Sequence, residues 1–294
     1  MTGAALPGFS HTSEVVRGSS YAIAAAGRGP PVLLLHGFPQ DHTCWHRVAP
    51  PLARRHRVVL CDLKGVGASR APRGGLLGEG YSAREIAAEL VEVMSRARHE
   101  RFAVVGHDRG ARVAYRMALD HPDRVQRVCV LNVIPTVEQF ERLDADSAIE
   151  FWPFLLLAQP PPFAERLITA AAEHVVRHVL ATWSATSDAI APAAAAGYVA
   201  AFTPATIAAW CDEYRAAFHL DRAHDAEDRA ARHTISCPLL VHWGAAEQAA
   251  ASGPLPVWRR WARNVRGGAL PGGHFVPEEA AGLLAAVLLG FLRG

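Results

Sequence analysis

Six short apolar runs alternate along the chain with segments of helical periodicity, and this rhythm limits the possible folds more than any other feature. Each run has four to six residues and is rich in branched aliphatic side chains, which is typical of strands buried on both faces. The runs are 32–35, 58–61, 102–105, 128–131, 239–243 and 265–270, and the helical patterns are 82–98, 110–120 and 277–292. We therefore predict an α/β fold with a mostly parallel central sheet and helices on both faces. Runs 14–17 and 20–25 could add an antiparallel edge.

The rhythm stops between residues 137 and 231, where about 95 residues carry helical patterns, several prolines and no convincing strand. We predict a core of residues 1–136 and 232–294, with residues 137–231 inserted as a helical cap. Ligands in open α/β sheets bind outside the carboxyl ends of the strands. The cap would therefore form the roof of a pocket.

The charge balance excludes several classes of protein. The 28 acidic and 30 basic residues nearly cancel, and no run of five or six like charges occurs, which argues against a nucleic-acid partner. Only one of the 30 basic residues is a lysine, Lys64, and it lies in DLKGVGAS. This context lacks the pattern of a phosphate-binding loop, and a single lysine leaves little room for pyridoxal-phosphate chemistry.

Cysteine spacing and the N-terminal segment predict a cytoplasmic location. The five cysteines are odd in number, far apart and without metal-ligand spacing, as expected for reduced thiols. The first 18 residues lack the basic and apolar regions of a signal peptide. Residues 189–211 carry no charge, but three helix breakers and many alanines argue against a membrane span.

Alanine occupies 11 of the 22 positions from 189 to 210, all within the predicted cap. A surface helix would normally carry charge at many of these positions. We therefore expect this segment to be buried against the core or against a second subunit, which would make a homodimer through the cap.

The sequence Gly106-His107-Asp108-Arg109-Gly110 joins the apolar run 102–105 directly to a helical pattern. Glycines at both flanks suit a sharp turn in which backbone segments approach too closely for a Cβ atom. Aspartate stands where a nucleophilic serine is common in such a turn, and a helix N-terminus favours its ionised form. We predict that Asp108 is a nucleophile; the plainer alternative is an N-cap aspartate.

Partners for this aspartate follow in the order expected along the chain. His274 lies in Leu270-Pro271-Gly272-Gly273-His274-Phe275, a glycine-bent loop after the last strand, and is the candidate general base. Glu247 follows the strand 239–243 and is our choice for the acid that orients this histidine. Asn132, after strand 128–131, is the alternative, although an amide supplies no charge.

The segment His36-Gly37-Phe38-Pro39 follows the run 32–35 and can turn the Phe38 N–H toward Asp108. Together with the Arg109 N–H it would form an oxyanion hole. His107, inside the turn itself, is a further candidate at the site.

The motifs HGFPQ, DLKGVGAS, GHDRGAR, ALDHPDRV and LPGGHF resemble the α/β-hydrolase superfamily over nearly the whole chain, from Glu14 to Phe291. More narrowly, the chain resembles the fluoroacetate and haloacetate dehalogenases. That resemblance implies an aspartate nucleophile, no metal or organic cofactor, and substrate-carboxylate binding by Arg109 and Arg112. These arginines stand three apart on the first helical turn, so both can reach one small anion. The alternative interpretation is that they are ordinary arginines on the exposed surface of this helix.

The resemblance also places Trp183 and Tyr214 in the pocket, where they line the substrate or contact the halide. It departs from the family at Phe151-Trp152-Pro153-Phe154, which puts Pro153 and Phe154 at the positions expected to donate hydrogen bonds to the halide. A two-residue slip would place Trp152 there instead. Asn132 likewise replaces the family's usual acid.

These residues predict a hydrolytic dehalogenase that converts a small 2-halocarboxylate to the 2-hydroxy acid and halide through an ester on Asp108, with fluoride the most demanding leaving group. An epoxide hydrolase is the alternative enzyme. It would use the same Asp108 and His274, with Tyr214 and, if it reaches the site, Tyr198 as acids. A third interpretation is a catalytically weak protein that binds carboxylates on the same scaffold.

Overall fold

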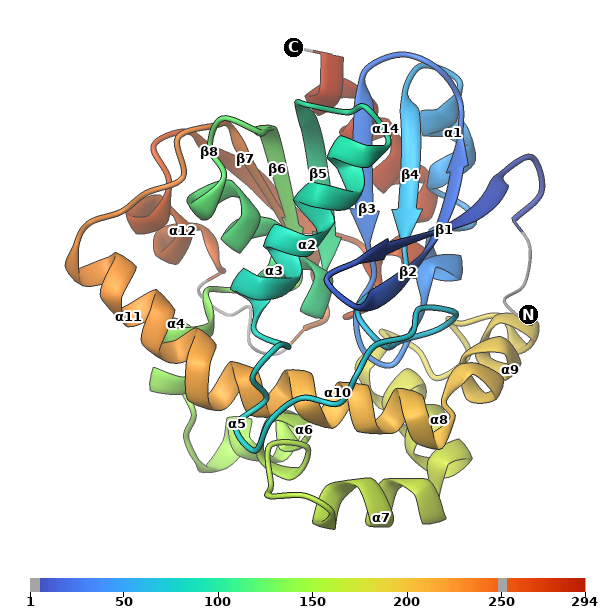
Figure 1. Ribbon diagram of the computed structural model, residues 1–294, viewed down its shortest axis with the longest axis vertical. Coiled ribbons are helices and arrows are strands. Elements are labelled where there is room, and N and C mark those ends of the chain that lie inside the picture. The colour runs from blue at the N-terminus through green and yellow to red at the C-terminus, as the bar shows by residue number, and fades with distance from the viewer. Residues whose placement is uncertain (1–5, 248–252, 294) are drawn as a thin grey trace.

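The computed structural model describes residues 6–247 and 253–293 and is built on one eight-stranded sheet (Figure 1). The strands occur in the spatial order β1-β2-β4-β3-β5-β6-β7-β8. Their bounds are Ser10–Val16, Ser19–Ala26, Pro31–Leu35, Arg57–Cys61, Phe102–His107, Val125–Leu131, Leu239–Gly244 and Val265–Leu270 for β1 to β8. All six predicted apolar runs are strands, and the bounds differ from the predicted ones by at most three residues.

The strand directions agree with the prediction of a mostly parallel sheet. Strands β3 to β8 pair in parallel, whereas β1 pairs antiparallel with β2, and β2 pairs antiparallel with β4. The carboxyl ends of the six parallel strands therefore meet at one edge of the sheet. Side chains that follow these strands can converge there.

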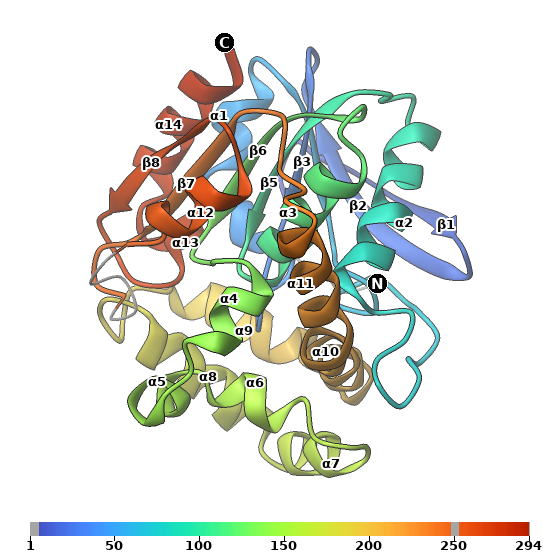
Figure 2. The same ribbon diagram turned by 90° about the vertical axis from the view of Figure 1, so that its left-hand side faces the viewer.

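Helices cover both faces of the sheet, as predicted. In Figure 2, α2 (Ala83–Arg96) and α3 (Arg109–Asp120) lie on one face, and α1 (Ala49–Ala53) and α14 (Ala281–Arg293) lie on the other. The start of α2 follows from its sequence, because Ser82 and Glu85 form a reciprocal capping box. The remaining core elements are a 3₁₀ turn, His42–Trp45, and α12 (Leu255–Trp261).

The predicted helix 277–292 is two helices in the structure. The first, α13, spans Val276–Glu279, and α14 begins at Ala281. Ala280 between them has φ −121° and ψ 28°, outside helical geometry, so the chain changes direction there. The apolar periodicity runs through this break, and periodicity alone could not reveal it.

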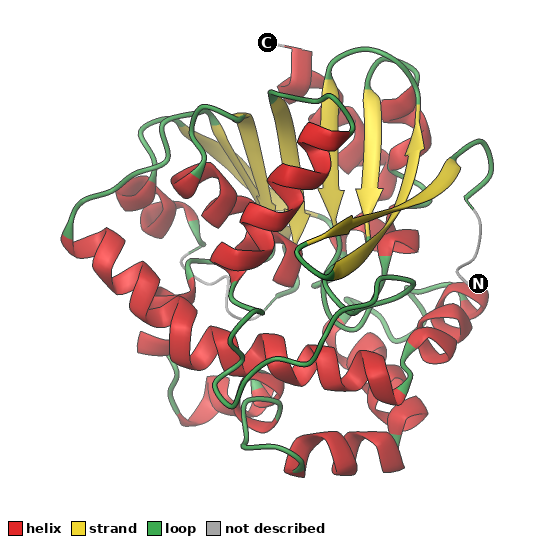
Figure 3. Cartoon of the chain, viewed as in Figure 1, coloured by secondary structure: helices red, strands yellow, loops and turns green. Residues whose placement is uncertain are grey.

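Between β6 and β7 the described chain forms helices and no strand (Figure 3). They lie as a layer beyond the strand ends, where the arrowheads in Figure 1 point. The bounds are Thr136–Glu141, Ala145–Glu150, Trp152–Leu156, Phe163–Ala170, Ala172–Trp183, Pro192–Ala201, Pro204–Ala216 and Arg222–Ala230 for α4 to α11, with a π-helical turn, Ala217–Asp221, before α11. The arrangement is that of a cap, while the division at residues 137 and 231 stays a prediction.

The alanine-rich segment divides into a buried part and an exposed part. In α10, Ala208, Ala209 and Trp210 are buried, and Trp210 packs edge-on against Phe38 of the core. Of the six alanines of α9, three are exposed in the single chain and three are partly buried. Burial against the core is therefore correct for α10, and pairing of α9 with a second subunit stays a prediction.

No single helix among the described residues has the length and hydropathy to cross a membrane. Residues 192–201 and 204–230 meet both criteria only as a pair, and that pair is bent by 83°.

The single lysine is buried in the core. Lys64 follows β4, and its Nζ atom lies 2.6 Å from Oε1 of Glu89 on α2. The second oxygen of Glu89 accepts a hydrogen bond from the hydroxyl of Tyr21 on β2. Because both charges are paired inside the fold, this cluster ties the β4 loop to α2 and the sheet edge.

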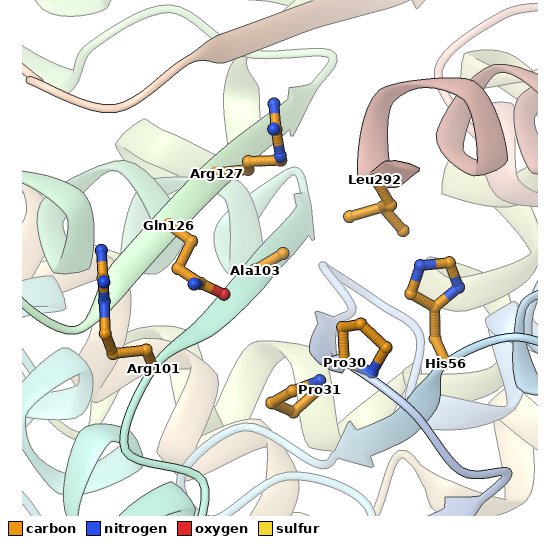
Figure 4. Close-up of a pocket in the computed structure, with 8 residues that line it drawn as sticks. All are labelled: Pro30, Pro31, His56, Arg101, Ala103, Gln126, Arg127 and Leu292. Carbon is orange, nitrogen blue, oxygen red and sulfur yellow. The ribbon is translucent and has the colours of Figure 1, made fainter. Parts of the chain in front are cut away.

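A cavity of about 400 Å³ lies at the amino ends of β3, β5 and β6 (Figure 4). Pro31, Ala103 and Arg127 line it together with His56 and Leu292. It lies at the opposite end of the strands from Asp108, so it is separate from the predicted site.

Candidate active site

Asp108 lies in a sharp turn between β5 and α3, with φ 47° and ψ −114°. A non-glycine residue with positive φ is strained, and such strain persists where the surrounding fold enforces it. The Asp108 side chain makes no hydrogen bond to the first turn of α3. The plain N-cap interpretation is therefore wrong, and the carboxylate points elsewhere.

The glycines around Asp108 are required by close backbone approach, as predicted. A Cβ atom on Gly106 would overlap the carbonyl oxygen of Gly110, and one on Gly110 would overlap that of His36. A Cβ atom on Gly37 would lie 2.5 Å from Cβ of Asp108. The loop after β3 therefore packs directly onto the turn.

The Asp108 carboxylate is held between this loop and His274. The Phe38 N–H donates to Oδ1 at 2.8 Å, which places Phe38 as predicted for an oxyanion-hole donor. Oδ2 lies 3.7 Å from Nε2 of His274. Burial alone would raise the pKa of Asp108, but the facing imidazole outweighs it and holds the pKa well below its usual range. Asp108 is therefore ionised at neutral pH.

Glu247, rather than Asn132, contacts the histidine. Oε1 of Glu247 lies 2.8 Å from Nδ1 of His274, and because a carboxylate can only accept, Nδ1 carries the proton. The Asn132 amide donates to Oε2 of Glu247 at 2.9 Å. Asn132 thus orients the acid, which in turn orients the histidine.

His274 lies between two carboxylates, and this determines its protonation. Burial lowers its pKa, but Asp108 and Glu247 raise it by more, to about 10. At neutral pH the imidazole is therefore protonated while Asp108 is ionised. It can accept a proton only after the negative charge of Asp108 is removed.

His107 forms a hydrogen bond with the backbone of the loop that carries His274. Its Nε2 atom lies 2.7 Å from the His274 carbonyl oxygen, so Nε2 must be the protonated nitrogen. Burial is the main cause that lowers the pKa of His107, to about 3, and the ring is neutral. His107 therefore contacts the backbone of the candidate base rather than the cavity.

Arg109 and Arg112 are not surface residues, since their exposed fractions are 0% and 2%. Nε of Arg109 forms an ion pair with Glu213 at 3.0 Å, whereas its Nη1 atom has no partner. Arg112 donates to the Ile134 carbonyl and the Thr136 hydroxyl, and its Nε atom has no partner. No acid among the described residues forms an ion pair with Arg112. Burial and the neighbouring Arg109 lower its pKa.

Phe154 occupies the position at which the family departure was predicted. Its ring lies 5.0 Å from the guanidinium of Arg112 and 5.9 Å from that of Arg109, and it meets Tyr214 edge-on at 5.1 Å. The Tyr214 hydroxyl is buried without a partner. Burial raises its pKa, so the hydroxyl is protonated and can donate.

The neighbouring candidates lie outside this cluster. Trp152 and Pro153 do not line the cavity described next, so the structure does not show the slip that would place Trp152 there. Tyr198 donates to Oε1 of Glu278 in the core. Its hydroxyl is thus already engaged.

A cavity of about 870 Å³ opens between the strand ends and the cap helices. Asp108, Arg112, Phe154, Trp183 and His274 all line it. Arg109, Tyr214 and the Phe38 side chain lie behind this wall, so the structure separates the predicted pocket residues into lining and supporting groups. Trp183 packs edge-on against His274, with ring centroids 5.0 Å apart.

One cluster has the composition of a metal site. The candidate ligand atoms of Asp41, His42 and Asp62 lie within 4.8 Å of one another. The Asp62 carboxylate, however, already accepts from the His42 ring and backbone and from the Ala68 N–H. Asp41 caps the adjoining turn through Thr43. These groups fasten the loops after β3 and β4.

Sequence reasoning missed Glu213 and Glu279. Glu213 stands directly before Tyr214, in a charged cluster with Asp212 and Arg215 that follows an apolar helix stretch, and that position was the available signal. Glu279 lies five residues after His274 and accepts from the N–H groups of Gly273 and Phe275. Its role could be read only from the folded loop.

A family model for the alpha/beta hydrolase fold matches residues 30–281. The chain belongs to the α/β hydrolase family. The fold, the turn at Asp108 and the order of Asp108, Glu247 and His274 along the chain agree with this assignment, which makes the protein a hydrolase.

Two curated relatives that span most of the chain differ in their named activity. The chain is 39% identical to a fluoroacetate dehalogenase from a Burkholderia species, over 90% of this chain and 88% of the relative. It is 30% identical to a soluble epoxide hydrolase from Corynebacterium sp. (strain C12), over 92% of each. The crystal structure of ALR0039 from Nostoc sp PCC 7120 superposes with a TM-score of 0.92 at 40% identity, over 98% of this chain and 99% of that one.

Proposed function

We propose that this hydrolase is a dehalogenase that converts a small 2-halocarboxylate to the 2-hydroxy acid and halide. The observation that carries the proposal is Arg112, a buried cation without an ion-pair partner among the described residues, in the same cavity as Asp108. A buried unpaired charge is costly, and a substrate carboxylate would compensate it. The unpaired Nη1 of Arg109 adds a second donor nearby.

Asp108 attacks first. Oδ2, the oxygen not held by Phe38, displaces the halide from the α-carbon, so the carbon–halogen bond breaks as the ester bond forms. The substrate carboxylate, anchored by Arg112, would keep the α-carbon in line for this displacement. The halide departs toward the cap side of the cavity.

His274 then becomes a base. Esterification removes the charge of Asp108, so the pKa of His274 falls from its raised value and the ring loses its proton to solvent. The neutral ring takes a proton from water, and the resulting hydroxide attacks the ester carbonyl carbon. The oxyanion at Oδ1 is stabilised by the Phe38 N–H. When it collapses, the bond between Cγ and Oδ2 breaks, protonated His274 returns its proton to the leaving oxygen, and the 2-hydroxy acid departs.

Phe154 supports a preference among halogens. A phenyl ring cannot donate a hydrogen bond, so this position supplies no donor for the departing halide, and donation falls to other groups such as the Trp183 indole N–H that lines the cavity or the Tyr214 hydroxyl behind Phe154. Fluoride needs stronger hydrogen-bond donation than chloride or bromide. The proposal therefore gives chloroacetate and bromoacetate a higher kcat than fluoroacetate.

The decisive experiment follows halide release from chloroacetate, bromoacetate and fluoroacetate, and diol formation from styrene oxide. Halide release at multiple turnovers, faster for chloride than for fluoride, is the expected result. Diol formation without halide release would overturn the dehalogenase proposal. Carboxylate binding with no turnover of any compound would support the binding-protein interpretation.

An epoxide hydrolase is the second candidate, and one specific observation favours it. The protonated Tyr214 hydroxyl is buried and unpaired, as an acid that donates to an opening epoxide oxygen would be. The relative of Corynebacterium has that activity by name. The unpaired Arg112 speaks for the carboxylate substrate, because a neutral epoxide would leave this charge uncompensated.

A further inference from the structure

The loop that carries His274 is fastened on both sides by one side chain, that of Glu279. Oε1 accepts from the Phe275 N–H at 2.9 Å, and Oε2 accepts from the Gly273 N–H at 2.9 Å. These N–H groups belong to the two residues that flank His274. The charged carboxylate therefore fixes the backbone on either side of the candidate base, with hydrogen bonds stronger than those of a neutral acceptor.

The same carboxylate also reaches the cap. Oε2 accepts a third hydrogen bond, at 2.8 Å, from the N–H of Ala185, two residues beyond α8. In the reverse direction, the His274 N–H donates to the Trp183 carbonyl at 2.8 Å. A Cβ atom on Gly273 would lie 2.5 Å from the Ala185 nitrogen, so the two segments lie in contact. The His274 loop and the segment 183–185 thus form one hydrogen-bonded unit.

We propose that Glu279 is a positioning residue that joins the His274 loop to the cap segment 183–185 and thereby sets the distance of His274 from the Asp108 ester. This inference rests on the proposed ester at Asp108 but not on the leaving group, since a haloacetate and an epoxide give the same kind of ester. Glu279 touches neither substrate nor Asp108. Its effect falls on the second step, in which Nε2 of His274 must meet a water molecule beside the ester carbonyl.

The chemistry of an amide makes Glu279→Gln an informative change. Its single oxygen can accept on one side of His274 only, and the NH₂ group then faces an N–H donor on the other side. Displacement of a catalytic group by about 1 Å can cost 10²-fold in rate. Attack by Asp108 does not use His274 as a base, so the first step should change much less than the second.

The experiment compares the first halide burst with ester hydrolysis in Glu279→Gln and in wild type, using a substrate that the wild type turns over. The expected rate of the halide burst is within about twofold of wild type, while ester hydrolysis is slowed about 10- to 100-fold. Mass spectrometry should then show the covalent ester on the protein in the steady state. Glu173→Gln, an exposed position on α8, is the matched control and should leave both steps unchanged. A merely structural role would lower both steps together, without accumulated ester, and would overturn the proposal.

Two further variants separate the possible failures. His274→Gln must trap the ester, and if it does not, the proposed ester mechanism fails rather than the role of Glu279. If it traps ester while a folded Glu279→Gln accumulates none, the role of Glu279 is wrong. Should Glu279→Gln not fold, Ala185→Pro removes the cap N–H and puts the ring Cδ in its place, which breaks the contact with Glu279. The position is exposed and follows Ser184, whose ψ of 156° suits a following proline. Ala185→Pro should also slow hydrolysis selectively, and an unchanged ratio of the two steps would contradict the proposed link to the cap.

Discussion

The two sides of the cavity differ in how their charged groups are paired. On the side made by the loops after the strands, each carboxylate has a donor: Asp108 accepts from Phe38, Glu247 from His274 and Asn132, and Glu279, behind the lining residues, from three backbone N–H groups. On the side made by α3 and the cap residues that pack on it, Arg112 lines the cavity without an acid partner among the described residues. Behind it, Arg109 Nη1 and the Tyr214 hydroxyl are donors that lack an acceptor there. We call the first side the complete wall, because its carboxylates are all paired, and the second the incomplete wall, whose unpaired donors point to an anionic ligand.

His274→Gln gives the sharpest test of the complete wall. Steady-state turnover should fall at least about 10³-fold, because the first step proceeds while the Asp108 ester is not hydrolysed. Mass spectrometry should show one substrate fragment covalently attached at Asp108. His178→Gln, on α8, is the control, and a His274→Gln protein that stays free of ester while releasing halide would refute a nucleophilic Asp108.

Glu247→Gln tests which acid completes this wall. We expect kcat to fall about 10²- to 10⁴-fold, because the amide could present its NH₂ group to Nδ1 and no longer favours the charged ring. Asn132→Ala removes only a donor to Glu247, and its loss should stay below about tenfold. Steady-state kinetics measure both changes. The reverse ranking would make Asn132 the more important partner.

Arg112→Met tests the incomplete wall. Without this cation, kcat/KM for haloacetates should fall at least about 30-fold, mainly through KM, because the carboxylate loses a buried charged partner. Arg142→Met is the matched control, since Arg142 also lines the cavity but is half exposed and paired with Glu138. Its effect should stay below about threefold. Equal effects of the two changes would argue against carboxylate binding at Arg112.

The pH dependence of stability gives the smallest expected effect. The folded-state pKa of His274, about 10, lies above its ordinary value of 6.5. Its contribution to the free energy of unfolding is therefore fully present below pH 6.5 and is lost as the pH rises toward 10. Urea unfolding measures the free energy of unfolding at pH 6.5 and at pH 9.5. The decrease between these pH values should be larger in wild type than in His274→Gln by at least about 1 kcal/mol. Equal losses would mean that the ring is not held as an imidazolium.

The parts of the fold that sequence predicts are those with a local cause. The strands follow from short apolar runs, and the turn at Asp108 follows from Gly106 and Gly110, whose missing Cβ atoms the close packing requires. The contact of Glu247 with His274 also follows from a local cause, because its place after β7 brings it to the same sheet edge as His274, while its role as the acid stays a prediction.

The parts that sequence could not predict depend on contacts between distant segments. The Arg109–Glu213 pair joins residues 104 positions apart, and it turns one of two similar arginines into a supporting group. The contact of Glu279 with Ala185 spans 94 positions. The broken helix at Ala280 shows the converse case, in which an unbroken apolar pattern hides a change of direction.

The burial of Lys64 affects which chemical reagents can modify the positive charges of this protein. As the only lysine, with its ammonium against Glu89, it leaves the molecule without an exposed side-chain amine. Acylation and aldehyde cross-linking, which act on such amines, should leave the other 29 basic side chains untouched. These are arginines, which stay charged at any pH that proteins tolerate. The positive half of the surface charge is therefore resistant both to common lysine chemistry and to alkali.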